Sequence, residues 1–289
     1  MDYYSPTSIA DAIRLLSSPG ACVLAGGTDL IPQMQAGRRD PALIIDIKKI
    51  PQTRTISQHA NRFSIGAAVT GAELSEHPQL HACWPGIVEA FDLIGSSQIQ
   101  GRATPGGNFC NASPAADSVP AFIAANATCR IVGPQGEREC PVEQIIVSPG
   151  KTCLQAGEFI VSFMLPETLP YSADAYLRMT PRTEMDIAIT GAAVRLTLDK
   201  AGVCQTARVV LGAVGPTPLL AEAAAKHLPG SRLEKKTLQL FEEAVREQCR
   251  PINDKRGTIE YRTAVAAVLA RRSALIAYER ALARTEVQQ

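Results

Sequence analysis

The first fifty residues alternate between helix-like and strand-like hydrophobic patterns. Apolar residues recur at helical spacing between residues 5 and 18, after a Ser-Pro-Thr start signal. Short apolar runs at 22–25 and 42–47 predict buried strands, and residues 30–36 between them predict a short helix ending at Gly37. A helix, a strand, a helix and a strand in so short a stretch predict an α/β unit.

The next hundred residues mix both patterns. Residues 53–57 and 62–67 flank a polar turn at 58–61 and predict a hairpin. Residues 101–118 follow neither period, and we expect an ordered loop there, of the kind that is usually functional. The remaining segments predict helices at 70–75, 84–94 and 119–127, and strands at 128–132 and 159–165.

The C-terminal part has a different pattern. Residues 187–198 and 204–214 are rich in β-branched residues and predict an antiparallel hairpin. Three Ala/Leu-rich segments then predict helices at 219–227, 233–249 and 258–283. Pro166 and Pro170 bracket a polar link, so we place a domain boundary near 166–172.

Charge and composition narrow the function. The chain has 29 lysines and arginines against 28 aspartates and glutamates, a net charge of +1, which argues against nucleic acid and membrane surfaces as partners. We expect no membrane span, because no apolar run approaches about 20 residues. The N-terminus lacks the basic start of a secretory signal, so we expect a cytoplasmic protein.

The eight cysteines are scattered, and no CxxC motif occurs. The sequence therefore predicts free thiols, with no zinc ribbon or local iron–sulfur motif. His77, His81 and Cys83 have a metal-like spacing, but Pro78 interrupts it and we interpret them as surface residues. We assign no catalytic residue and no metal ligand.

Two glycine pairs carry the chemistry that the sequence offers, although GxGxxG and the P-loop motif are both absent. The first, Gly26-Gly27, follows a predicted strand and precedes Thr28. Glycines there let successive amides turn inward as a nest for phosphate oxygens, to which the Thr28 hydroxyl adds a donor. A plain strand-to-helix turn that needs positive φ is the alternative.

The second pair, Gly106-Gly107, lies within the long segment without periodicity. Its small residues allow close approach of a ligand, and four polar side chains supply donors and acceptors: Thr104, Asn108, Ser113 and Asp117. Asp117-Ser118 also has the chemistry of a helix N-cap. Ligand binding and capping are both open for Asp117.

Three segments in this order, AGGTDL, TPGGNFCNASPAADSVPAF and LRMTPRTEMDIAITGAAVRL, resemble the FAD-binding medium subunit of the molybdenum hydroxylases, the xanthine dehydrogenase and carbon monoxide dehydrogenase family. The resemblance implies an α+β fold. Residues 1–168 would form a vanillyl-alcohol-oxidase (PCMH)-type FAD-binding domain of two α/β subdomains, about 1–55 and 56–168. Residues 172–289 would form a C-terminal domain, an antiparallel sheet with a helical bundle.

The resemblance also implies a noncovalent FAD and its contacts. Asp117 would accept a hydrogen bond from the ribose or adenine end, the backbone near Ile160 would touch the flavin, and Arg178 would stand near the isoalloxazine ring. An ordinary ion pair with Glu184 or Asp186 is the alternative for Arg178. The pyrophosphate would lie between two segments, Val23, Leu24, Ala25, Gly26, Gly27, Thr28, Asp29 and Leu30 on one side and Ala103, Thr104, Gly106, Gly107 and Asn108 on the other.

In function, the resemblance implies an electron-transfer subunit of an oxidoreductase. Its FAD would take electrons from a [2Fe-2S] cluster on a small subunit and pass them to NAD, quinone or oxygen, while a large subunit with molybdopterin oxidises the substrate. The assembly would be a dimer of heterotrimers. Two alternatives remain: an accessory or assembly paralogue with weak or no FAD binding, and a self-contained flavin oxidase.

Overall fold

The computed structural model describes residues 1–59 and 62–284. These residues divide into two units, neither of which is continuous in sequence. Unit 1 comprises Met1–Leu74, Ser97–Ala112 and Asn126–Glu167. Unit 2 comprises Ser75–Ser96, Ser113–Ala125 and Thr168–Gln289, of which the structure describes the part up to residue 284.

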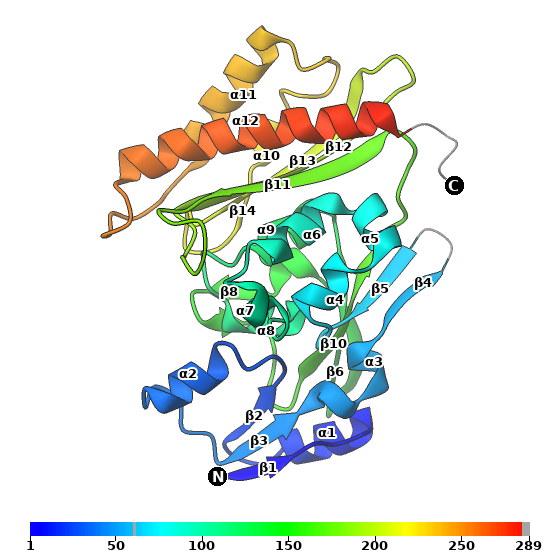
Figure 1. The fold of residues 1–289 in the computed structure, drawn as a ribbon, viewed down its shortest axis with the longest axis vertical. Coiled ribbons are helices and arrows are strands. Elements are labelled where there is room, and N and C mark those ends of the chain that lie inside the picture. The colour runs from blue at the N-terminus through cyan, green and yellow to red at the C-terminus, as the bar shows by residue number, and fades with distance from the viewer. Residues whose placement is uncertain (60–61, 285–289) are drawn as a thin grey trace. The chain divides into compact units, whose positions relative to one another are not determined.

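Unit 1 begins with a parallel three-stranded sheet in the order β1-β3-β2 (Figure 1). Its strand β3 is buried throughout, as expected for the central strand of a parallel sheet. The helix after β1 begins at Ser8, whose side chain accepts from the Asp11 amide. The elements are β1 (Asp2–Tyr4), α1 (Ile9–Leu16), β2 (Ala21–Leu24), α2 (Leu30–Gln35), β3 (Leu43–Asp46), the 3-10 helix η1 (Ile47–Lys49) and α3 (Pro51–Arg54).

The second sheet of unit 1 has five antiparallel strands in the order β4-β5-β10-β6-β7. Apolar residues from both sheets share one core, which includes Ile45, Val132 and Val161. The strands are β4 (Ile56–His59), β5 (Arg62–Gly66), β6 (Thr128–Gly133), β7 (Gly136–Pro141) and β10 (Phe159–Leu165), with a small pair β8 (Ile146–Ser148) and β9 (Lys151–Thr152). The remaining helices of this unit are α4 (Gly71–Ser75), α7 (Ser97–Gln100), α8 (Pro105–Asn111) and η2 (Val142–Gln144).

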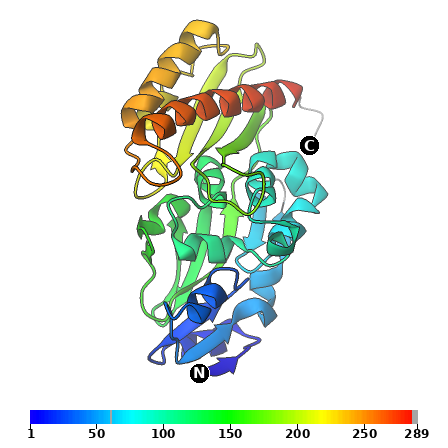
Figure 2. The same cartoon turned by 60° about the vertical axis from the view of Figure 1, so that its left-hand side comes forward.

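Unit 2 is a four-stranded antiparallel sheet with helices on both faces (Figures 1 and 2). The strands follow one another as β11 (Ser172–Met179), β12 (Thr190–Leu198), β13 (Cys204–Gly212) and β14 (Leu219–Leu220). One face packs against α10 (Glu222–Ala225), α11 (Lys235–Gln248) and α12 (Ile259–Ala283). On the other side are α6 (Pro85–Asp92) and α9 (Ser118–Ala124), with α5 (Pro78–Cys83) beside α6.

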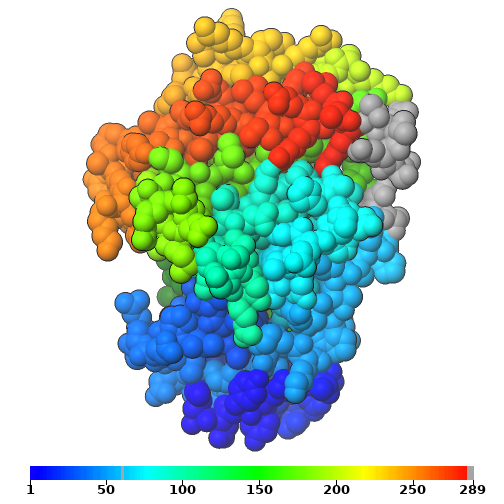
Figure 3. Space-filling view, in the orientation of Figure 1, coloured from blue at the N-terminus to red at the C-terminus, as the bar shows by residue number. Residues whose placement is uncertain are grey.

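Helix α12 lies along β11 and β12 through a row of alanines, among them Ala266, Ala270 and Ala274, all fully buried. Small side chains bring the helix close to the sheet. Its outer flank forms the orange-to-red band of Figure 3. No helix of the described residues is long and apolar enough to cross a membrane.

The structure confirms most of the expected helices and strands, corrects two segments and adds strands that the sequence did not predict, among them β7 and β11. The expected loop at 101–118 contains α8 and the start of α9. Residues 219–227 begin with β14 and only then become helical. The expected turn at 58–61 falls partly on residues 60–61, which lie outside the described residues.

Candidate functional site

The first glycine pair forms the turn between β2 and α2. A Cβ on Gly26 would lie 1.9 Å from the carbonyl oxygen of Arg102, so only glycine fits there. Gly27 has a φ of +81°, which also favours glycine. The short distance from Gly26 to Arg102 shows that the turn packs directly on residues 102–103. The fold therefore brings the two glycine segments together within unit 1.

The amides of this turn are free donors. Among the described residues, the N–H groups of Gly26, Gly27, Thr28 and Asp29 donate no hydrogen bond. The carbonyls of Gly27 and Asp29 instead accept from residues in α2. Successive unpaired amides in a turn form a nest for anionic oxygens, so this turn fits a pyrophosphate. The strand-to-helix turn that the sequence offered as one alternative is therefore present, and its unpaired amides are compatible with the other, a nest for phosphate oxygens.

The second glycine pair lies in α8, which begins at Thr104 with Pro105 in its first position. Its first amides are already paired. Gly106 donates to the Ala67 carbonyl at 2.9 Å, and Gly107 donates to Thr104 Oγ1 at 3.1 Å. A Cβ on Gly106 would lie 2.7 Å from the Ala67 oxygen, whereas one on Gly107 would meet only Thr104 Oγ1, at 3.0 Å. This segment therefore offers a close approach at Gly107 rather than a row of free amides.

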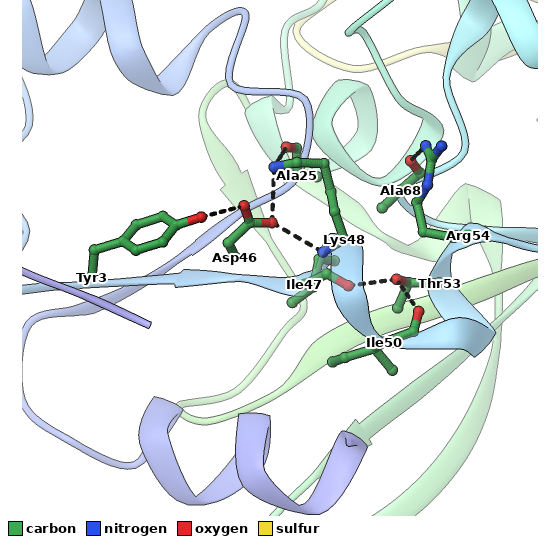
Figure 4. A network of polar contacts seen from close by, with 9 residues as sticks. All are labelled: Tyr3, Ala25, Asp46, Ile47, Lys48, Ile50, Thr53, Arg54 and Ala68. Atoms are coloured by element: carbon green, nitrogen blue, oxygen red, sulfur yellow. Dashed lines mark hydrogen bonds and ion pairs between the residues drawn. The ribbon is translucent and has the colours of Figure 1, made fainter. Parts of the chain in front are cut away.

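A polar network holds the first turn in place (Figure 4). Lys48 Nζ donates to the carbonyl of Ala25 at 2.8 Å and pairs with Asp46 at the same distance. Tyr3 donates its hydroxyl to the second oxygen of Asp46 at 2.6 Å. Lys48 and Tyr3 both lower the pKa of Asp46, against the effect of burial, and Asp46 stays an anion. The carbonyl that precedes Gly26 is thereby fixed by a charged side chain.

The same network extends toward the second segment. Thr53 Oγ1 donates to the carbonyls of Ile47 and Ile50 at 2.7 and 2.9 Å, and Arg54 donates to that of Ala68 at 2.7 Å (Figure 4). Arg54 also pairs with Glu73 at 2.6 Å. Because Ala67 holds the Gly106 amide, these side chains support both glycine segments from one side.

Ile160 lies in a β-bulge of β10. Its side chain is buried, and the register with β6 shifts between Ile160 and Ser162. The carbonyl of Val161 accepts from the Ala67 amide at 2.9 Å, which extends the pairing of β10 with β5 by one residue. Bulges of this kind often lie beside functional sites, where they re-aim the backbone.

Asp117 and Arg178 form a buried ion pair in unit 2, with Asp117 Oδ2 2.7 Å from Arg178 Nη1. Tyr176 donates to the other oxygen at 2.8 Å. Burial raises the pKa of Asp117 to about 6, and the nearby guanidinium and hydroxyl oppose this. We therefore expect the carboxyl to be mostly ionised at neutral pH.

The Asp117–Arg178 ion pair bears on the alternatives that the sequence left open for these two residues. Asp117 precedes α9 but makes no capping hydrogen bond there, so the capping interpretation is wrong. Arg178 pairs with the buried Asp117, and Asp186 pairs instead with Arg182, so the alternative of a surface ion pair for Arg178 is wrong. The strand register explains this outcome, because residues at alternate positions of β11 point to the face that carries α9.

The site residues thus fall in both units. The two glycine segments and Ile160 belong to unit 1, and Asp117 and Arg178 belong to unit 2. Sequence reasoning missed Tyr3, Lys48 and Tyr176. A carboxylate in the otherwise apolar strand ALIIDI was the available signal for the network around Lys48, since buried carboxylates need partners.

The metal-like spacing of His77, His81 and Cys83 falls on α5 and the residue before it. Among residues 1–59 and 62–284, no group of three or more histidine, cysteine or acidic side chains is arranged to hold a metal ion. His77 caps α5 by accepting from the Leu80 amide at 3.2 Å.

Two known protein families match this chain, one over each part of it. An FAD binding domain in molybdopterin dehydrogenase matches residues 1–168, and a CO dehydrogenase flavoprotein C-terminal domain matches residues 175–277. The carbon monoxide dehydrogenase medium chain of Afipia carboxidovorans is 35% identical over 287 residues, covering 99% of this chain and 98% of the relative. That of Hydrogenophaga pseudoflava is 31% identical over 282 residues, covering 96% and 97%.

A solved structure agrees with these matches. Carbon monoxide dehydrogenase from Hydrogenophaga pseudoflava, in a form that lacks the Mo-pyranopterin moiety of its molybdenum cofactor, superposes with a TM-score of 0.92. The identity is 32%, over 97% of this chain and 98% of the other.

The α+β fold and the FAD binding domain matched over residues 1–168 define a protein that binds a flavin nucleotide. The chain belongs to the family of FAD-binding subunits of the molybdenum hydroxylases, which includes the carbon monoxide and xanthine dehydrogenases and whose members are oxidoreductases.

Proposed function

We propose that the chain is the FAD-carrying electron-transfer subunit of a heterotrimeric molybdenum hydroxylase. It receives electrons from a [2Fe-2S] cluster on a small subunit and delivers them to an external acceptor, which is NAD, quinone or oxygen. The row of free amides at residues 26–29 carries this proposal, because it provides an anion site that the chain itself leaves unfilled. Its relatives are subunits of dehydrogenases.

Each part of the site has a role toward the cofactor. The amides of Gly26, Gly27 and Thr28 bind the pyrophosphate, and Lys48 keeps the preceding carbonyl turned away from it. Gly107 leaves room for the phosphates on the other side. Bound FAD supplies reversible one- and two-electron chemistry.

Arg178 supplies a positive charge toward the flavin, and Asp117 holds its guanidinium in one orientation. A cation suits a reduced flavin, whose ring carries negative charge. Asp117 is also assigned to the ribose or adenine end. Since both of its oxygens have protein partners, any such bond would share an oxygen with Tyr176 or Arg178.

We also propose the larger organisation. Residues 1–168 form the FAD-binding domain, with subdomains about 1–55 and 56–168, and residues 172–289 form the C-terminal domain. The extents of the two family matches support this division. The large subunit holds molybdopterin, and the whole is a dimer of heterotrimers. All eight cysteines are free thiols, which supports a reducing compartment such as the cytoplasm.

FAD binding by the purified protein tests the proposal. We expect a yellow protein whose flavin is released by acid precipitation, since the site holds the cofactor by hydrogen bonds alone. A protein that stays colourless and takes up no FAD on titration would favour the accessory paralogue. Flavin that stays with the precipitate would contradict noncovalent binding.

A further inference from the structure

Three polar side chains meet on one face of the sheet in unit 2. Asp117, just before α9, accepts from the Tyr176 hydroxyl at 2.8 Å through one oxygen and from Arg178 at 2.7 Å through the other. Tyr176 and Arg178 are two residues apart on β11, so both point to the same face of that strand. All three side chains are largely withdrawn from solvent, and only 4% of the Arg178 side chain is exposed. We call these three residues the Asp117 cluster.

The sheet is built to hold the Tyr176 hydroxyl at this place. A Cβ on Gly191, in the neighbouring strand β12, would clash with the hydroxyl oxygen and lie 3.1 Å from the ring carbon that bears it. Glycine inside a strand weakens the strand and often marks a close approach, which here is that of the tyrosine ring. Glu89 of α6 also accepts from the Tyr176 amide at 2.9 Å. The tyrosine is therefore fixed through both its backbone and its hydroxyl.

The guanidinium of Arg178 still has donors to offer. Within the part of the chain that the structure describes, its only hydrogen-bond partner is Asp117, which it meets through Nη1. Buried polar groups in proteins are nearly always paired, so unpaired donors on a largely buried arginine indicate a ligand that the chain does not itself supply. The proposed flavin is such a ligand, because its reduced ring carries negative charge.

One proton decides the charge of the Asp117 cluster. Burial raises the pKa of Asp117 to about 6, and the Arg178 charge and the Tyr176 hydroxyl oppose this rise. Burial also raises the pKa of Tyr176, so its hydroxyl remains a donor. Above about pH 6 the cluster is neutral, because the Asp117 carboxylate balances Arg178. Below that pH Asp117 takes a proton, and the cluster carries one positive charge.

The groups that set the charge of Asp117 are Tyr176 and Arg178. The other charged side chains on α6 and on the strands packed against α9 have partners elsewhere. They are Arg195 and Arg208, which donate to the carbonyls of Ala125 and Ile123 at the other end of α9; Glu89, which pairs with Arg280; Asp92, which accepts from Ser75; and Asp174, which accepts from the Gly86 amide.

Given the FAD subunit proposed above, we infer that Tyr176 is a positioning residue for electron transfer: its hydroxyl holds the Asp117 carboxylate in place beside Arg178, and the charge that the cluster presents to the flavin rises by one when Asp117 takes a proton. A positive charge stabilises the anionic reduced ring more than the neutral oxidised ring, so the protonated cluster raises the midpoint potential of the FAD. The electrons come from the iron–sulfur partner and the proton on Asp117 comes from solvent.

Redox titration of the FAD-loaded chain against reference dyes, from pH 5 to pH 9, tests this inference. Asp117→Asn leaves the Arg178 charge unbalanced at every pH, so its midpoint potential should match the wild type at pH 5 and lie above it at pH 8. Tyr176→Phe removes a hydrogen bond that favours the Asp117 anion, so Asp117 should titrate at a higher pH. The potential of this variant should exceed that of the wild type most near pH 7 and little at pH 5 or pH 9.

Tyr278→Phe is the matched control for the lost hydroxyl. Tyr278 also lies in unit 2, but it donates to the Gly202 carbonyl, at 2.7 Å, and not to Asp117. Its midpoint potential should follow that of the wild type at every pH. A purely structural role for Tyr176 predicts no change of this shape. Wild-type and Tyr176→Phe curves that coincide, or that differ equally at every pH, would overturn the inference.

Variants of Arg178 give an independent measurement. Arg178→Gln should lower the midpoint potential at pH 5, where the wild-type cluster is positive, and Arg178→Lys should recover part of the loss. Arg182→Gln is the control, because Arg182 is exposed and pairs with Asp186 at 3.1 Å. Equal potentials for the two glutamine variants at pH 5 would contradict the inference while leaving FAD binding intact. A wild-type chain that takes up no FAD would contradict the proposed function itself, and the inference with it.

Discussion

Lys48 shows how a side chain that touches no ligand can determine a ligand site. Its ammonium group binds the carbonyl just before the first glycine pair and neutralises Asp46, so the free amides that follow keep one direction. We expect Lys48→Met to weaken FAD binding about five- to tenfold, the equivalent of one lost hydrogen bond of about 1 to 1.5 kcal/mol.

Titration of the apoprotein with FAD, followed by quenching of flavin fluorescence, measures this change. Lys49→Met is the control, because Lys49 is exposed and next in sequence. Identical affinities for the two variants would mean that the turn holds its geometry without Lys48.

Gly107 tests the second glycine segment. Gly107→Val places a branched side chain where the only nearby atom is Thr104 Oγ1, so the fold tolerates it while the approach of a phosphate is blocked. We expect loss of FAD with the apoprotein still folded, as seen by circular dichroism. Gly101→Val is the control, because its Cβ would meet nothing closer than 3.6 Å. Unfolding of the Gly107 variant alone would make this glycine structural.

Asp117 tests the buried ion pair. Asp117→Ala leaves the guanidinium of Arg178 buried without its partner, so we expect the free energy of unfolding of the apoprotein to fall by about 3 kcal/mol. The double variant Asp117→Ala with Arg178→Met should recover much of this loss, because no uncompensated charge remains. Urea unfolding of the four proteins measures the coupling, and additive losses would contradict it.

At the scale of elements, α8 depends on its N-cap residue, Thr104. Thr104 accepts from the Gly107 amide, and the helix contains two glycines in seven residues, so its own propensity is weak. Thr104→Ala should lower the stability of the apoprotein by about 1 kcal/mol, measured by thermal unfolding. Thr104→Ser, which keeps the capping oxygen, should remain close to the wild type. A loss of equal size in both variants would argue against capping.

How far the sequence predicts an element depends on what packs against it. Strands β2, β3 and β10 were predicted, because both of their faces are apolar. The strand β11 was missed, since Asp174 and Arg178 interrupt its hydrophobic pattern, and so was the charged edge strand β7. Helix α8 has no apolar stripe, but Thr104-Pro105 was a start signal that could have revealed it.

In the candidate site too, local features were predictable from the sequence, and contacts between distant segments were not. Local features of the glycine turns were visible in the sequence. The pairing of Asp117 with Arg178 was not, because it depends on which residues of β11 face α9. Neither was the position of Cys129 opposite Cys140, which depends on the register of β6 and β7.

At the scale of the molecule, unit 2 contains a buried acid, Asp174. Its ionisation makes the stability of the folded protein depend on pH. Asp174 accepts from the Gly86 amide, and its other oxygen has no partner among the described residues. Burial raises its pKa from 3.8 to about 6. The folded state therefore binds the proton more tightly than the unfolded chain, and the stability that this contributes at low pH is lost as the pH rises through about 6.

We expect Asp174→Asn to remove this part of the pH dependence. The melting temperature of the apo wild type, relative to that of the variant, should fall between pH 5 and pH 7. Asp40→Asn, at an exposed aspartate, should follow the wild type at every pH. Parallel curves for Asp174→Asn and wild type would show that Asp174 is already ionised at pH 5.

The isolated chain should transfer electrons without oxidising an organic substrate. The proposed function assigns substrate oxidation to the molybdopterin subunit, so we expect dithionite-reduced FAD on this chain to be reoxidised by an artificial acceptor, while aldehydes and heteroaromatic compounds leave the oxidised flavin unbleached. Anaerobic spectra at the flavin absorption band measure both. Bleaching by an organic substrate would favour a self-contained oxidase.

The discontinuity of the two units sets the order in which the chain can fold during synthesis. Unit 1 has all of its residues once residue 167 has left the ribosome, but segments 75–96 and 113–125 are then still without their sheet. Glu89 pairs with Arg280, 191 residues later, so α6 gains this partner only when α12 is made. Such long sequence separations slow folding and leave apolar helices exposed meanwhile. A nascent chain should therefore need a chaperone most between residue 167 and the end of α12.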